Sequence, residues 1–155
     1  MININKICIC GGGSLGHTCA AVLSSQPNVE VIMYTQHPDN WQQEFSVIDP
    51  QNKKYNAYLS TISNQPQVVI PNADMILLCL PAFLVEQTLL DIRPFLSPNT
   101  IVGSVVGNTG FFLFAHEILR NTNNGLFAFQ RVPYISRVLE YGKKAALLGY
   151  KDSLL

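Results

Sequence analysis

Residues 6–23 read KICICGGGSLGHTCAAVL and hold two sets of residues whose types and spacing could do chemistry. One set follows the spacing G-x-G-x-x-G, which is typical of a turn that holds the phosphates of a dinucleotide: Gly11, Gly13 and Gly16. The other set has the side-chain types that bind zinc: Cys8, Cys10, His17 and Cys19. The elements that position these residues decide which chemistry is possible.

A strand and a helix are expected on either side of the glycines. Residues 6–10 form a short apolar run, which predicts a buried strand, and residues 29–34 form a second one. Between them, apolar residues repeat at helical spacing: Leu15, Cys19, Val22 and Leu23. This is a βαβ unit, the context in which the glycine spacing indicates dinucleotide binding. Gly11 would permit the tight turn, Gly13 the approach of the pyrophosphate, and Gly16 the close packing of helix on strand.

The same elements argue against zinc. Cys8 and Cys10 would point to one buried face of the first strand, whereas His17 and Cys19 would lie on different sides of the helix. Zinc ligands must converge on one point, and a buried free cysteine behaves as a small apolar residue. We therefore predict no metal site, and we expect Cys79 to lie in the core as well.

The end of the second strand bears on the choice of cofactor. In dinucleotide-binding βαβ units an acidic residue about 20 positions after the glycines binds the ribose of NAD. Here that region holds Thr35, Gln36 and His37, none of which is acidic. A carboxylate would repel a 2′-phosphate, so its absence favours NADP over NAD. Asp39 would restore the preference for NAD if the loop is longer than this count assumes.

The rest of the chain continues the alternation of strands and helices. Apolar runs predict strands at 73–81, 100–106, 126–130 and about 144–149, and helical spacing predicts helices at 83–92 and 111–121. Residues 37–72 are polar, with an edge strand or hairpin arm at YNAYLSTI, and residues 131–143 suggest a loop or short helix. Together these predict one α/β domain over 1–155, with a mostly parallel, doubly wound sheet in three layers.

Composition narrows the class of protein. The 155 residues are 48% apolar and 13% charged, with zero net charge, which excludes a disordered chain and argues against nucleic-acid binding. No apolar run reaches the length of a membrane span and no signal peptide precedes the first strand, so we expect a cytoplasmic protein without a membrane partner. The low charge suggests a surface covered by another domain or subunit, and a homodimer is compatible with it.

Four blocks of sequence resemble a known family: GGGSLGH, ADMILLCLPAFLVEQTL, NTIVGSVVGNTGF and RVPYISRVLEYGKKAALLGYK. They are similar to the N-terminal Rossmann domain of the opine (octopine/nopaline) dehydrogenases, which are related to ketopantoate reductase and 6-phosphogluconate dehydrogenase. The resemblance implies NAD(P)H-dependent condensation of an amino acid with a 2-oxo acid. It also implies a second, helical domain that carries the catalytic residues. That domain is not among these residues, so we expect no catalytic residue here and no activity from this chain alone.

The resemblance also assigns positions to the cofactor. The pyrophosphate would lie at Gly11, Gly13, Ser14, Leu15 and Gly16, and the adenosine end at Thr35, Gln36 and His37. The nicotinamide and its ribose would lie after two later strands, near Leu80, Pro81, Ala82, Val106, Gly107 and Asn108.

Several alternatives stay open at this stage. The chain could belong to a ketopantoate-reductase-like 2-oxo acid reductase, to a non-catalytic dinucleotide sensor, or to a binder of another nucleotide such as S-adenosylmethionine. Tyr134 and Arg137 are expected in a loop near the sheet, where Arg137 would hold a carboxylate or form a structural ion pair. His116 and Glu117 are expected to be exposed on a helix and without a catalytic role.

Overall fold

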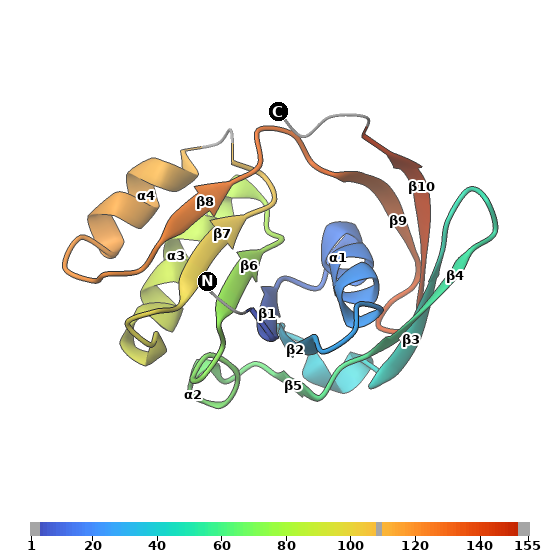
Figure 1. Ribbon diagram of the computed structural model, residues 1–155, viewed down its shortest axis with the longest axis horizontal. Coiled ribbons are helices and arrows are strands. Elements are labelled where there is room, and N and C mark those ends of the chain that lie inside the picture. The colour runs from blue at the N-terminus through green and yellow to red at the C-terminus, as the bar shows by residue number, and fades with distance from the viewer. Residues whose placement is uncertain (1–3, 108–109, 152–155) are drawn as a thin grey trace.

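The computed structural model describes residues 4–107 and 110–151 (Figure 1). Its larger sheet has six strands, and all neighbouring pairs are parallel. Across the sheet the strands are β5 (Thr61–Ser63), β2 (Glu30–Tyr34), β1 (Lys6–Cys10), β6 (Met75–Leu78), β7 (Ile101–Ser104) and β8 (Leu126–Ala128). The chain adds β2 and β5 on one side of β1 and then β6, β7 and β8 on the other. The order therefore reverses between β1 and β6, and ligands of doubly wound sheets bind beyond the strand ends at such a point.

Helices cover both faces of this sheet, as the sequence predicts. One face carries α1 (Ser14–Ser24), and the other carries α2 (Pro66–Val69), α3 (Ala82–Ile92) and α4 (Phe111–Ile118). Single turns of 3-10 helix follow β2 and α3, η1 (Pro38–Asn40) and η2 (Arg93–Phe95). Within residues 4–107 and 110–151, none of the helices has the length and hydropathy needed to cross a bilayer.

A second sheet packs on the outer side of α1, so that this helix lies between two sheets (Figure 1). Its strands, in spatial order, are β4 (Lys54–Tyr58), β3 (Glu44–Ile48), β10 (Lys144–Tyr150) and β9 (Tyr134–Glu140). β3 pairs in parallel with β10, which lies about a hundred residues further along the chain. The segment after β2 and the last segment of the chain therefore form one layer.

Part of this layer departs from the sequence prediction. A loop or short helix is expected over residues 131–143, and this is wrong, because residues 134–140 form β9. The outward-facing Ile135 and Leu139 are both exposed and apolar, and this hides the alternation that marks a strand. The strand expected near 144–149 is confirmed as β10, and YNAYLSTI supplies both β4 and the edge strand β5.

The four cysteines are buried and free, and the larger sheet separates them into two pairs. Cys8 and Cys10 pack in the core on the α3 side, whereas Cys19 and Cys79 pack on the α1 side. A hydrogen bond with Cys8, together with burial, raises the pKa of Cys10 well above its ordinary value, which disfavours the thiolate that binds metals. Among the residues described, no three His, Cys, Asp or Glu side chains gather into a possible metal site.

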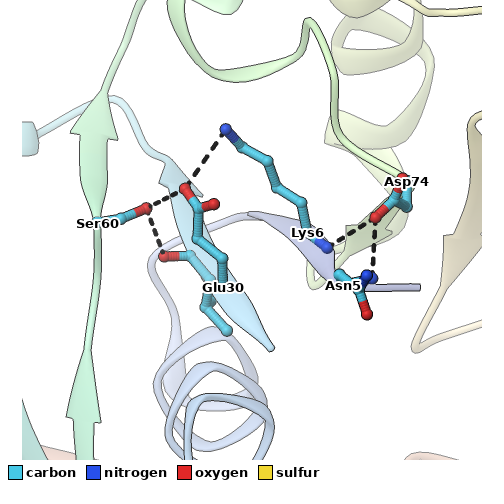
Figure 2. Close-up of polar contacts among 6 residues, drawn as sticks. Asn5, Lys6, Glu30, Ser60 and Asp74 are labelled. Atoms are coloured by element: carbon cyan, nitrogen blue, oxygen red, sulfur yellow. Dashed lines mark hydrogen bonds and ion pairs between the residues drawn. The ribbon is translucent and has the colours of Figure 1, made fainter. Parts of the chain in front are cut away.

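Polar contacts join the strands at the edge of the sheet where β1 and β2 begin (Figure 2). One carboxylate oxygen of Asp74, just before β6, accepts hydrogen bonds from the backbone N–H groups of Asn5 and Lys6, at 2.9 and 2.8 Å. Glu30 pairs with the Lys6 ammonium at 3.4 Å and accepts a hydrogen bond from the Ser60 hydroxyl at 2.7 Å. Side-chain contacts therefore hold together the N-terminal ends of β1, β2 and β6. The glycine turn lies at the opposite, C-terminal ends of these strands.

Candidate functional site

A pocket of about 360 Å³ opens at the ends of β1, β2 and β6, where the strand order reverses. Three segments that are distant in the sequence form most of its wall: the glycine turn after β1, residues 34–37 at the end of β2, and residues 79–81 after β6. The remaining lining residues come from α3 and from the turn between β9 and β10: Leu84, Gln87, Thr88, Asp91 and Tyr141. The pocket therefore lies where the fold predicts a ligand.

The glycine turn is shaped by two close approaches of the backbone. Gly11 has a φ of +115°, and a Cβ there would lie 2.6 Å from the carbonyl oxygen of Cys79. A Cβ on Gly16 would overlap the carbonyl oxygen of Gly11, so only glycine lets α1 pack this closely on the turn. Gly13 differs, because a Cβ there would meet no atom within 4 Å. The turn is therefore closed toward the sheet and open at Gly13, where α1 begins.

The first turn of α1 is suited to an anion. Gly13 is its N-cap residue and provides no capping side chain, and the turn carries no acidic residue. The first N–H groups of a helix lack intrahelical partners, and the helix dipole makes this end positive. A phosphate at Gly13 would thus meet N–H donors, the positive end of the helix and no repelling carboxylate from this turn.

Tyr141 contacts the same turn from the second sheet, and sequence reasoning missed it. Its hydroxyl lies 3.4 Å from the Thr35 hydroxyl, and a Cβ on Gly12 would overlap it. This contact explains the middle glycine of Gly11–Gly13, which the G-x-G-x-x-G spacing leaves free to vary. The signal in the sequence was therefore the extra glycine, but nothing local pointed to Tyr141 as its neighbour.

His17 connects the glycine turn to the second sheet. Its Nε2 accepts a hydrogen bond from the Gly142 N–H at 2.9 Å, so Nδ1 carries the proton and donates to the Gly13 carbonyl, also at 2.9 Å. The ring is fully buried and stacks on Trp41, with 4.1 Å between the centroids. Burial lowers the pKa of His17 below its usual 6.5, against a smaller opposing effect of the Gly13 carbonyl. His17 is thus a neutral structural link rather than a metal ligand.

The residues after β2 form one side wall of the pocket. Thr35, Gln36 and His37 all line it, with Thr35 buried and the other two exposed. None carries a carboxylate, and Asp39, in η1, is exposed and lies outside the lining. The only carboxylate in the lining is Asp91 of α3, whose oxygen accepts a hydrogen bond from the Gln87 amide at 2.8 Å.

The α3 wall was also missed from the sequence, although a signal existed. Leu84, Gln87, Thr88 and Asp91 stand three, four and seven positions apart, so they share one face of the helix. Val85, Leu89 and Ile92 form the buried face. The spacing of the buried residues predicts the helix, but it does not indicate what the neighbouring face of the helix lines.

The structure brings together seven of the residues expected to bind the cofactor: Gly11, Gly13, Thr35, Gln36, His37, Leu80 and Pro81. Others in the expected set lie outside the lining. The Ser14 hydroxyl accepts a hydrogen bond from the Val138 N–H at 3.2 Å, Leu15 packs against the core, and Ala82 is half-buried where α3 begins. Val106 lines a separate cavity with residues 130–132, and Asn108 lies outside the described residues. The roles in cofactor binding stay predictions for the residues inside the lining and for those outside it.

The remaining candidates are placed away from this pocket. Tyr134 and Arg137 lie in β9 rather than in a loop, and Arg137 is exposed. Burial raises the pKa of Tyr134 to about 12, so this phenol stays protonated near neutral pH. His116 and Glu117 are exposed on α4, as expected, and Glu117 pairs with Arg120 at 3.6 Å.

Comparison with known proteins agrees with this geometry. Residues 7–108 match the family described as ketopantoate reductase PanE/ApbA, and this region runs from β1 through β7. The chain belongs to the ketopantoate reductase PanE/ApbA family. The matched region contains the glycine turn and both strand ends that form the pocket with it.

Several curated relatives of the chain are opine dehydrogenases. The chain is 29% identical over 160 residues to tauropine dehydrogenase of Arabella iricolor, covering 94% of the chain and 40% of that protein. It is 27% identical over 163 residues to octopine dehydrogenase of Mizuhopecten yessoensis, covering 96% and 41%. The resemblance to opine dehydrogenases is therefore confirmed, and the chain spans about two fifths of the length of these relatives.

Solved structures show the same fold. Octopine dehydrogenase in complex with NADH and agmatine superposes with a TM-score of 0.86 at 25% identity, covering 96% of this chain and 40% of that one. Yersinopine dehydrogenase with NADP+ bound gives a TM-score of 0.84 at 14% identity, over 97% and 40%. The second likeness concerns the fold alone.

Proposed function

We propose that this chain is the NAD(P)-binding domain of an opine-dehydrogenase-like oxidoreductase. The observation that carries the proposal is the pocket at the reversal of strand order, with the open glycine turn and the N-terminus of α1 in its wall. The full reaction would be the reductive condensation of an amino acid with a 2-oxo acid. The names of the curated relatives support this reaction class.

The described residues fit a dinucleotide. A pyrophosphate at Gly13 would receive backbone N–H groups from the turn and from the first turn of α1, without a side chain in its way. The adenosine would then lie toward Thr35 and the exposed face of α3, and the nicotinamide toward Leu80 and Pro81. When bound, the reduced nicotinamide supplies a hydride. The contribution of this chain is to hold and orient the dinucleotide.

NADP is the proposed preference, because residues 35–37 present no carboxylate to repel a 2′-phosphate. The octopine dehydrogenase structure at 25% identity contains NADH, which keeps NAD as the competing cofactor. The amino acid, the 2-oxo acid and the catalytic residues would be bound or supplied by a second domain outside residues 1–155. The matched family favours ketopantoate-reductase-like reduction of a 2-oxo acid as the alternative reaction.

Thermal unfolding with NADH, with NADPH and without ligand tests the binding function. A ligand that binds only the folded state adds about 2.7 kcal/mol of stability at 100 times its Kd, or roughly 5–10 °C in Tm for a domain of this size. We expect NADPH to raise Tm at lower concentration than NADH. Absence of a rise with either cofactor at millimolar concentration would refute the proposal.

Substitution at Gly13 makes the test specific to the glycine turn. Gly13→Glu places a carboxylate where the phosphate would lie, so the Kd should rise more than about tenfold through like-charge repulsion. Its backbone is extended and its surroundings are open, so the variant should fold normally. Gly13→Gln, which has nearly the same size without the charge, is the matched control and should lose less affinity than Gly13→Glu. Equal loss in both variants would indicate crowding of the turn rather than charge.

A further inference from the structure

We propose that Tyr141 is a cofactor-binding residue whose hydroxyl contacts the ribose on the adenosine side of the dinucleotide. This inference rests on the proposed function and adds to it a contact supplied by the second sheet. Tyr141 lies in the turn between β9 and β10, far in sequence from the βαβ unit that forms the rest of the site.

The position of the hydroxyl carries the argument. It touches Gly12 of the glycine turn and lies 3.4 Å from the Thr35 hydroxyl at the end of β2. A dinucleotide with its pyrophosphate at Gly13 must extend from the glycine turn toward the end of β2, and its adenosine-side ribose would lie on this path. Tyr141 is 37% exposed and lines the same pocket, so its phenol is accessible to a ligand there.

The turn that carries Tyr141 is fixed in place by contacts within the chain. Gly142 donates its N–H to His17 Nε2 at 2.9 Å and accepts a hydrogen bond from the Gln42 N–H at 3.0 Å. The Tyr141 ring packs edge-on against His17 and Trp41, with centroid distances of 5.5 and 5.6 Å. The phenol is therefore already oriented, which reduces the entropy that binding would otherwise lose.

The chemistry of the two hydroxyls suits a ribose. The hydroxyls of Tyr141 and Thr35 can each donate and accept a hydrogen bond. When one donates to the other, the pair still has one O–H donor and lone pairs for a ligand. Ribose hydroxyls bind to hydrogen-bond donors and acceptors, and a 2′-phosphate binds to donors. The contact to Thr35 is long for a hydroxyl pair, so a ligand oxygen could improve on it. Tyr141 should therefore strengthen binding of NADH and NADPH alike.

Isothermal titration of wild-type protein and Tyr141→Phe with NADH, NADPH and ADP-ribose tests this role. Removing the hydroxyl should weaken all three by about 3- to 10-fold, the effect of one hydrogen bond. ADP-ribose lacks the nicotinamide but keeps the adenosine-side ribose, so the substitution should weaken its binding as much as that of the dinucleotides. Tyr58→Phe, at an exposed tyrosine of β4 in the same sheet, is the matched control and should bind as wild type.

Each other result overturns the inference. Equal affinities of wild type and Tyr141→Phe would remove the role of the hydroxyl while leaving the proposed function intact. A loss with NADH and NADPH but not with ADP-ribose would place the contact at the nicotinamide end. Failure of the wild type to bind any of the three would overturn the proposed function and this inference together.

A second measurement uses the wild-type protein and does not depend on the variant. Trp41 is the chain's single tryptophan and packs against Tyr141 and His17. Binding at the Tyr141 hydroxyl should therefore change the Trp41 fluorescence when ADP-ribose is added. Unchanged emission at saturating ADP-ribose would contradict the contact.

Discussion

At the scale of single residues, His17 shows how neighbours decide what a side chain can do. In the sequence it stands among three cysteines and resembles a zinc ligand. In the structure both of its ring nitrogens are engaged, one by the Gly13 carbonyl and one by the Gly142 N–H. A nitrogen that accepts a backbone hydrogen bond has no lone pair left for a metal. The same two bonds fix the tautomer and join the glycine turn to the turn that carries Tyr141.

The stability of the domain should depend on pH through His17. Its pKa is lowered in the folded state, so the unfolded chain binds the extra proton first as the pH falls. The contribution of the neutral ring is therefore complete above the unfolded value of about 6.5. It is lost as the pH falls through the lower folded pKa. Urea unfolding across pH 7.5 to 5 should show this loss.

Two variants distinguish the contribution of His17 to this pH dependence from the contributions of other groups. His17→Gln should be less stable than wild type at pH 7.5 and should show a flatter decline toward pH 5. His37→Gln, at an exposed histidine of the pocket wall, is the control and should retain the wild-type decline. A decline that is equally steep in His17→Gln would contradict the assignment.

At the scale of elements, the parallel sheet could be predicted from the sequence and the second sheet only in part. Strands β1, β6 and β7 are short runs of buried apolar residues between turn residues, a local signal that does not depend on distant partners. β9 has exposed apolar residues on its outer face. β3 pairs with the nearby β4, but its pairing with β10 joins segments about a hundred residues apart, so no window of sequence contains that pairing.

The candidate site likewise contains residues that could be predicted from the sequence and residues that could not. Its glycine turn and the ends of β2 and β6 follow from one βαβ unit and its continuation, so their residues could be named in advance. Tyr141 could not, because its place depends on the β9–β10 turn packing against His17 and Trp41. Ser14 was expected at the pyrophosphate, but its hydroxyl accepts a hydrogen bond from the Val138 N–H of β9. Knowledge of the second sheet was needed in both cases.

The starting edge of the parallel sheet gives a prediction at this scale. Asp74→Ala removes the acceptor of two backbone N–H groups that join β6 to β1 (Figure 2). We expect the free energy of unfolding to fall by about 1–3 kcal/mol, since hydrogen bonds to a charged acceptor are lost. Chemical denaturation measures this loss, and Glu86→Ala, at an exposed position of α3, is the control.

The same variant separates stability from binding. Asp74 lies at the opposite end of the strands from the pocket, so the folded Asp74→Ala protein should bind NADPH with the wild-type Kd. Weaker binding by protein that is still fully folded would show that the two edges of the sheet are coupled.

At the scale of the whole molecule, apolar side chains remain exposed next to the site. Phe83 is 81% exposed and Leu113 78%, and both lie in the first turn of their helices, α3 and α4. These turns follow β6 and β7, so they lie at the same edge of the sheet as the pocket. A covering surface at this edge would bury both side chains and would close over the nicotinamide end of the cofactor.

This arrangement predicts that binding and catalysis can be separated. The chain alone should bind NADPH or NADH but should not oxidise either when pyruvate and an amino acid are added, because its pocket is proposed to hold only the cofactor. A chimaera that joins it to the part of octopine dehydrogenase outside the matched two fifths should gain turnover, measured as loss of reduced cofactor. Gly13→Glu in the chimaera is the control and should abolish that gain through loss of cofactor binding. Turnover by the unextended chain would show instead that residues 1–155 include a complete catalytic site.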